Sequence, residues 1–78
     1  MNIFYLDTVF TFDKYEGDTL EEIAEFDPSY IEWCIQKLEV FYIDEDTVRR
    51  LESTYKHFSI SEKARNILDK KKIKINSI

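Results

Sequence analysis

The chain has 78 residues and a formal net charge of -5, with 16 Asp and Glu residues against 11 Lys and Arg residues. This length suits one small domain, so we expect residues 1–78 to fold as a single unit. Hydrophobic residues make up 44 % of the chain, and one Gly and one Pro exclude the collagen-like and low-complexity classes. The sequence therefore predicts a globular domain that is stabilised mainly by apolar packing.

The same composition excludes several kinds of protein. The longest apolar runs contain only four residues, far below the roughly 20 that a membrane-spanning helix needs, and the N-terminus has no secretory pattern. We therefore expect a cytoplasmic protein without membrane contact. A single cysteine, Cys34, excludes an internal disulfide, and with His57 it makes no zinc site unless carboxylates complete the ligand set. We expect Cys34 to be an inert core thiol and His57 to end a helix.

The N-terminal third predicts a strand and a turn. Residues 3–12 are rich in aromatic and β-branched side chains and partly alternate, which is typical of a half-buried strand. Residues 13–18 hold the only glycine, Gly17, and three carboxylates, a composition typical of a turn. We therefore expect a short hairpin or chain reversal around Gly17.

Two helices are predicted next. Thr19 and Glu22 have the spacing of a capping box, so a first helix of about two turns should begin there. Asp27 followed by Pro28 predicts the N-cap and first position of a second helix, with the Asp carboxylate accepting from free backbone amides. Its apolar stripe is widened by Tyr30 and Trp33, which suggests burial on two sides. The stripe consists of Ile31, Cys34, Ile35 and Leu38.

The C-terminal half predicts a short core segment and two further helices. Residues 40–43 form either a brief strand or a packed connector, and residues 44–46 bring negative charge to the start of a third helix. The stripe of that helix is Val48, Leu51, Tyr55 and Phe58. Ser59 and Glu62 repeat the capping-box spacing and predict a fourth helix, whose stripe is Ile60, Ala64, Ile67 and Leu68. This helix fades into the lysine run, whose cluster we expect at a solvated helix end, and residues 70–78 form a basic tail that is either an edge strand or frayed.

These elements predict an α+β fold: a small, helix-rich single domain with an N-terminal β-strand or hairpin and three to four helices. Charge is divided unevenly along it, because residues 1–57 carry 14 acidic and 5 basic side chains, whereas residues 58–78 carry 2 acidic and 6 basic ones. The body is therefore acidic and the tail basic.

No catalytic or metal-binding motif is predicted. The carboxylates of Asp13, Glu16 and Asp18 crowd one turn, but their spacing around Gly17 does not match a calcium loop. Gly17 also stands alone, whereas a phosphate-binding loop needs several glycines. We expect no metal and no cofactor, and we expect that the chain is not an enzyme.

One segment resembles a known family. Residues 12–24 and 27–33 are similar to the small C-terminal domain of exodeoxyribonuclease X-like proteins, which reads roughly F-G-K-[YH]-[KR]-G-K-T-L-x-E-I and then D-P-x-Y-[IL]-x-W. The resemblance implies a compact accessory module near DNA-processing enzymes, with an N-terminal hairpin packed on helices and with the nuclease carboxylates in a separate domain. The matching positions are Phe12, Lys14, Tyr15, Gly17, Thr19, Leu20, Glu22, Ile23, Asp27, Pro28, Tyr30, Ile31 and Trp33.

The departures from this pattern concern charge. Asp13, Glu16 and Asp18 stand where the family has Gly, Lys or Arg, and Lys, so the turn should repel a phosphate backbone. We therefore predict a non-catalytic protein-interaction module, accessory to a DNA-processing or mobile-element system. The protein-binding residues that we predict are Asp13, Lys14, Tyr15, Glu16, Asp18, Glu21 and Glu25.

Two alternatives stay open. A nucleic-acid-binding module would use a basic and aromatic set, although we expect Tyr15, Tyr30 and Trp33 to be core residues more often than a base-stacking platform. That set is Lys14, Tyr15, Lys70, Lys71, Lys72 and Lys74. A homodimer is the second alternative, because a chain this small with an edge strand at residues 73–75 would gain stability by pairing.

Overall fold

The computed structural model describes residues 2–76, and positions 1, 77 and 78 of the predicted domain lie outside the described residues. It has four α-helices, one short 3-10 helix and a two-stranded sheet, so the predicted α+β class is confirmed. The elements are β1 (Asn2–Phe4), η1 (Asp13–Tyr15), α1 (Leu20–Phe26), α2 (Pro28–Lys37), β2 (Phe41–Ile43), α3 (Glu45–Thr54) and α4 (Glu62–Asn76). None of these helices is long and apolar enough to cross a membrane.

The sheet joins the N-terminus to the middle of the chain. β1 and β2 are parallel, with Ile3 opposite Tyr42, and α1 and α2 form the connection between the two strands. The strand predicted over residues 3–12 is therefore too long. It ends at Phe4, and a single antiparallel bridge between Val9 and Thr19 closes the reversal around Gly17 instead.

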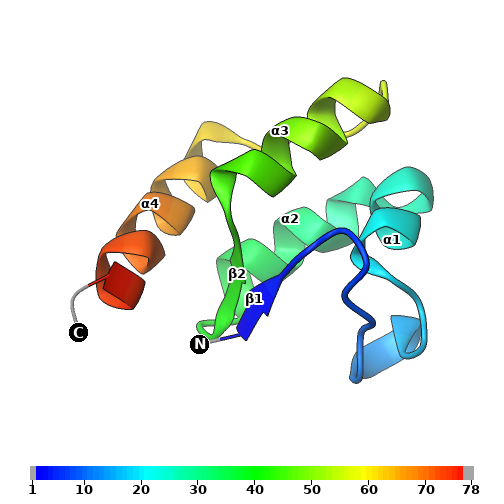
Figure 1. Ribbon diagram of the computed structural model, residues 1–78, viewed down its shortest axis with the longest axis horizontal. Coiled ribbons are helices and arrows are strands. Elements are labelled where there is room, and N and C mark those ends of the chain that lie inside the picture. The colour runs from blue at the N-terminus through cyan, green and yellow to red at the C-terminus, as the bar shows by residue number, and fades with distance from the viewer. Residues whose placement is uncertain (1, 77–78) are drawn as a thin grey trace.

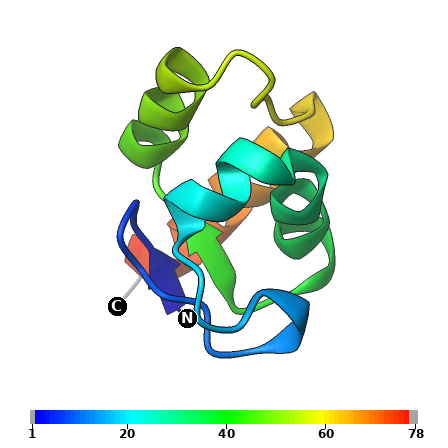
Figure 2. The ribbon, with the colours of Figure 1, turned by 90° about the vertical axis from the view of Figure 1, so that its right-hand side faces the viewer.

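Different elements lie at the two ends of the long axis of the molecule. Figure 1 shows η1 and α1 together at one end and the C-terminal half of α4 at the other, with the sheet and α2 between them. Figure 2, viewed from the first of these ends, shows η1 and α1 in front. The molecule extends over 33 Å along this axis. Surfaces on η1 and on the end of α4 are therefore not contiguous.

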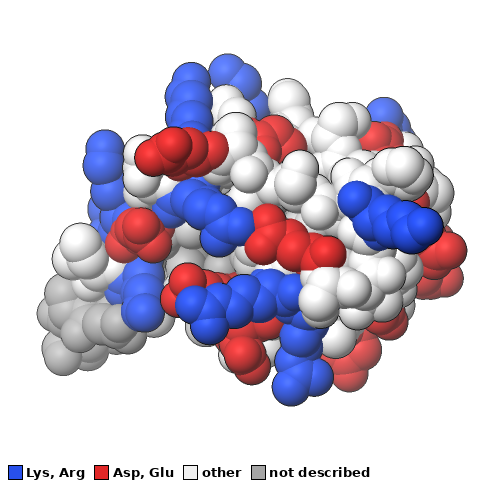
Figure 3. All heavy atoms as spheres, turned by 90° about the horizontal axis from the view of Figure 1, so that it is seen from above, with Lys and Arg blue, Asp and Glu red and all other residues white. Residues whose placement is uncertain are grey.

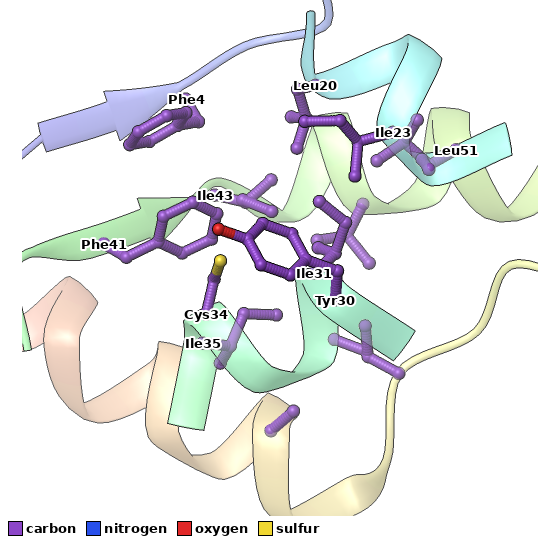
Figure 4. Close-up of a cluster of buried hydrophobic side chains, with 14 of the residues drawn as sticks. Phe4, Leu20, Ile23, Tyr30, Ile31, Cys34, Ile35, Phe41, Ile43 and Leu51 are labelled. Atoms are coloured by element: carbon purple, nitrogen blue, oxygen red, sulfur yellow. The ribbon is translucent and has the colours of Figure 1, made fainter. Parts of the chain in front are cut away.

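The core lies between α2, the sheet and the inner faces of α1, α3 and α4. Figure 4 shows Tyr30 and Cys34 of α2 pointing toward the strand residue Phe41, with Ile31 and Ile35 of the same helix in the same cluster. Cys34 is fully buried, and burial raises the pKa of its thiol to about 11, as an inert core thiol requires. The other buried apolar residues are Phe4, Phe10, Leu20, Ile23, Ala24, Tyr42, Ile43, Val48, Leu51, Phe58, Ile60, Ala64 and Leu68.

Helices α1 and α2 begin where the sequence predicts, whereas α4 begins later. Thr19 and Glu22 form the full capping box of α1. Asp27 occupies the N-cap of α2, but its side chain makes no capping hydrogen bond there. At α4 the predicted cap, Ser59, is wrong: the hydroxyl of Ser61 accepts from the backbone N–H of Ala64, and the helix starts two residues later than expected.

Three further predictions need correction. Val40 is 57 % exposed, so only residues 41–43 of the predicted core segment are buried. Helix α3 ends at Thr54, which leaves His57 in the following turn rather than at the helix end. The tail predicted as an edge strand or a frayed end is helical through Asn76, because α4 continues along the lysine run.

Lys71 anchors this helical run to the rest of the domain. Its ammonium group is buried and donates to the carbonyl oxygens of Ile35, Leu38 and Phe41 at 2.9, 2.9 and 2.7 Å. These three bonds use every donor of the ammonium, and Ile35 and Leu38 belong to the negative end of α2. Lys71 therefore fastens α4 to the C-terminus of α2 and to β2.

Candidate functional site: an aromatic and acidic cleft

A cleft of about 440 Å³ opens between η1 and the start of α2. Two short elements bring its residues together: the 3-10 turn places Asp13 and Lys14 on one side, and the first turns of α2 place the aromatic residues on the other. Its walls are Asp13, Lys14, Asp27, Ser29, Tyr30 and Trp33.

The backbone at Asp13 sets the shape of η1. Asp13 has φ +60°, in the left-handed region that few residues other than Gly, Asn and Asp adopt readily. Its carboxylate accepts a hydrogen bond from the Tyr30 hydroxyl at 2.8 Å, which holds the turn against α2. Burial, followed by this hydrogen bond, raises the pKa of Tyr30, so the phenol stays protonated and keeps donating.

Asp27 organises the other side of the cleft. Its two oxygens accept from the hydroxyls of Tyr15 at 2.6 Å and Ser29 at 2.8 Å. These hydrogen bonds, that from Tyr15 first, lower the pKa of Asp27, so it is a carboxylate at neutral pH. The residue predicted to cap α2 thus ties η1 to α2 through its side chain.

Four aromatic side chains contact one another in a row at the site. Phe26 meets Tyr15 edge to face at 5.2 Å, Tyr15 meets Tyr30 at 4.8 Å, and Tyr30 stacks on Trp33 at 5.8 Å. Tyr30 is buried, as predicted, whereas Trp33 is 44 % exposed. The prediction that Trp33 is a core residue is therefore wrong, and its indole borders the cleft.

Lys14 lies over this aromatic wall. Its ammonium is 5.1 Å from the centre of the Tyr15 ring and 5.4 Å from that of Tyr30, within the range of cation–π attraction. It is also 3.9 Å from Asp27, in a pair whose lysine side chain is 62 % exposed. The cleft therefore already accommodates one cation, supplied by the chain itself.

The predicted protein-binding residues fall into two groups. Asp13, Lys14 and Tyr15 lie in η1, and Glu16 and Asp18 follow in the same loop. Glu21 and Glu25 are one turn apart on α1. Both carboxylates raise the pKa of Tyr55. Burial is the largest cause of that raised pKa, followed by the hydrogen bond to Glu21 and by the negative charges of Glu21 and Glu25. They therefore line a neighbouring surface next to Tyr55 and do not line the cleft.

The predicted nucleic-acid-binding residues are not brought together. Lys14 and Tyr15 lie in η1, at the opposite end of the long axis from the lysines of α4 (Figure 1). Lys71 is buried, which leaves Lys70, Lys72 and Lys74 exposed in that helix, and Lys74 lies 3.8 Å from Glu39.

The basic residues of α3 are balanced by acidic ones. Arg49 pairs with Glu45, and Arg50 pairs with Asp46, each one helical turn away. Figure 3 shows acidic and basic side chains interspersed over the face seen from above. That view therefore contains no continuous basic surface.

Comparison with protein families shows what the cleft segment is similar to. Residues 10–39 match the family model described as exodeoxyribonuclease X-like C-terminal. This confirms the resemblance found in the sequence. The match spans 30 of the 78 residues and contains every residue that lines the cleft. No curated protein and no solved structure matched the chain in two further comparisons.

The exodeoxyribonuclease X-like segment has a structural reason for its pattern. Asp13 stands at the first glycine of that pattern and has a positive φ, and Gly17, at the second, has φ +96°. Both positions therefore need left-handed backbone. Asp27, Tyr30 and Trp33 were not predicted as binding residues, although their D-P-x-Y-x-x-W spacing places all three at one end of α2.

Proposed function

We propose that the chain is a non-catalytic protein-interaction module that binds a basic segment of a partner protein through the cleft and the acidic surface beside it. That acidic surface consists of Glu16, Asp18, Glu21 and Glu25. The observation that carries the proposal is the charge of this region. Lys14 is its only basic residue, whereas the acidic residues of residues 13–27 are Asp13, Glu16, Asp18, Glu21, Glu22, Glu25 and Asp27. Complementary charge steers association and selects a basic partner.

The cleft supports a binding role more than a catalytic one. Both of its carboxylates accept hydrogen bonds from tyrosine hydroxyls, and the Asp27 pKa is lowered rather than raised towards neutrality. A carboxylate that acts as a general acid or base near neutral pH needs a raised pKa. Among residues 2–76, no group of three His, Cys, Asp or Glu side chains is arranged to hold a metal ion.

The match to the exodeoxyribonuclease X-like C-terminal family supports a setting in DNA processing. In that setting, the partner would be a DNA-binding protein, and the basic surface that the chain binds would be the surface with which the partner contacts DNA. An acidic module would then associate with the partner rather than with nucleic acid, because like charge repels the phosphate backbone.

Binding by the purified chain tests the proposal. Fluorescence anisotropy should be measured with a labelled hexalysine peptide, a labelled hexaglutamate peptide and labelled single- and double-stranded DNA at about 150 mM salt. We expect binding of the basic peptide alone, weakened by added salt because the attraction is electrostatic. The combined variant Asp18→Asn, Glu21→Gln, Glu25→Gln should bind the basic peptide more weakly than the wild type does. The variant Glu45→Gln, on α3, should bind it as the wild type does.

The alternative function gives the opposite result. DNA capture with a steep loss of affinity on adding salt would support a nucleic-acid-binding module. If combined Lys70→Gln, Lys72→Gln, Lys74→Gln substitution abolished that capture, the binding surface would be α4 and the proposal would be overturned.

A further inference from the structure

We infer that the cleft is a seat for a single arginine side chain of the basic partner, with the guanidinium placed between Trp33 and the carboxylates of Asp13 and Asp27. This inference rests on the proposed function and specifies the partner residue that it selects. It follows from the shape of the cleft, from the aromatic wall and from the hydrogen-bonding capacity of the two carboxylates.

The aromatic side chains at the cleft attract cations, and they leave enough exposed ring surface for a second cation. The cleft already holds the Lys14 ammonium over Tyr15 and Tyr30. Trp33, the best cation–π acceptor among the side chains, stacks on Tyr30, lines the cleft and is 44 % exposed. An incoming planar cation can therefore stack beside Lys14 without displacing a core residue.

The carboxylates add directional acceptors. Asp13 takes its hydrogen bond from Tyr30 on Oδ2, and a carboxylate offers about four acceptor positions in total. Asp27 accepts one hydroxyl on each oxygen and is 24 % exposed. Both groups are fixed by these bonds before a ligand arrives, which lowers the entropic cost of binding.

Arginine fits this arrangement better than lysine. A guanidinium is planar, stacks on an indole and donates in two directions to carboxylates, whereas an ammonium is a compact and strongly hydrated charge. The volume of about 440 Å³ is ample for one side chain.

The indole itself reports on the seat, because Trp33 is the only tryptophan of the chain. Hexaarginine and hexalysine peptides of equal length and charge should be titrated into the full chain while Trp33 emission is recorded, with isothermal titration calorimetry as an independent measurement. We expect the arginine peptide to bind about five-fold more tightly than the lysine peptide and to change Trp33 emission.

Two variants locate the binding. Asp13→Asn keeps an acceptor for Tyr30 and a side chain that tolerates positive φ, and should lower affinity for hexaarginine about five-fold. The matched change Asp46→Asn, on α3, should leave it nearly unchanged. Trp33→Leu, followed by calorimetry, should remove the preference for arginine over lysine.

Two outcomes would overturn the inference and are distinguishable. Equal affinity for both peptides without a change in Trp33 emission would show that basic segments bind only the acidic surface outside the cleft. The arginine seat would then be wrong, whereas binding of a basic partner would stand on that acidic surface alone. Absence of binding by either basic peptide would overturn the proposed function and this inference with it.

Discussion

Glu32 of α2 accepts both the backbone N–H and the hydroxyl of Ser61, at 2.8 and 2.7 Å, across 29 residues of sequence. Ser61 in turn accepts from the N–H of Ala64 in the first turn of α4. This is the reciprocal bonding of a capping box, except that the glutamate comes from another helix. Glu32 therefore stabilises the N-terminus of α4 and holds that helix against α2.

The charge of Glu32 should matter for stability at neutral pH. Burial alone would raise its pKa, but the hydrogen bonds from Ser61 and Gln36 and the positive charge of Lys63 together outweigh burial, so the net pKa is lowered. We expect Glu32→Gln to lower the free energy of unfolding by about 1 kcal/mol at pH 7. Urea unfolding of both proteins measures this difference.

The pH dependence of that difference follows from the sign of the shift. A carboxylate with a lowered native pKa stabilises the fold above its ordinary value of 4.5, and this contribution disappears as the pH falls through the native pKa. The gap between wild type and Glu32→Gln should therefore close on acidification. A gap that stays constant from pH 7 to pH 3 would contradict an ionic role for Glu32.

Lys71→Met should destabilise the protein although it removes a buried charge. Methionine fills much of the same space, but the carbonyls of Ile35, Leu38 and Phe41 lose their shared donor. We expect a loss of about 1–3 kcal/mol in the free energy of unfolding, measured by chemical denaturation. The neighbouring change Lys70→Met, at an exposed position of the same helix, is the control and should have little effect.

Gly17→Ala should be costly for backbone reasons alone. Gly17 has φ +96°, and no heavy atom lies within 4 Å of the position that a Cβ would occupy. We expect a loss of about 1 kcal/mol, visible as a lowered melting temperature. Glu16→Ala, one residue earlier at φ -54°, should have a smaller effect. Equal effects of the two changes would show that backbone conformation at Gly17 is not limiting.

Lys14→Gln should strengthen binding of basic peptides. Removing this cation from above Tyr15 and Tyr30 takes away the one repulsive charge of the cleft. We expect affinity for hexaarginine to rise about two- to five-fold by calorimetry, with little change in stability because the Lys14–Asp27 pair is exposed on the lysine side. Lys70→Gln, at the other end of the molecule, should raise affinity less. Weaker binding by Lys14→Gln would show that Lys14 itself contacts the partner.

Local sequence signals determined much of the fold. The Thr19 and Glu22 pair sets the start of α1, Pro28 sets the first turn of α2, and Asp44 caps α3 through the N–H of Thr47. These signals act within four residues, so the sequence contains them completely. The family match likewise depends on a contiguous segment, residues 10–39.

Tertiary structure decided the features that depend on distant partners. The lysine run looked like a basic tail, but three carbonyls from α2 and β2 hold Lys71 in the interior, and α4 continues past it. Asp27 had the pattern of a helix cap, yet its carboxylate accepts a hydrogen bond from the hydroxyl of Tyr15 in η1. A carboxylate or ammonium group forms hydrogen bonds with the partners that the folded chain places within bonding distance. Those partners need not be close to it in the sequence.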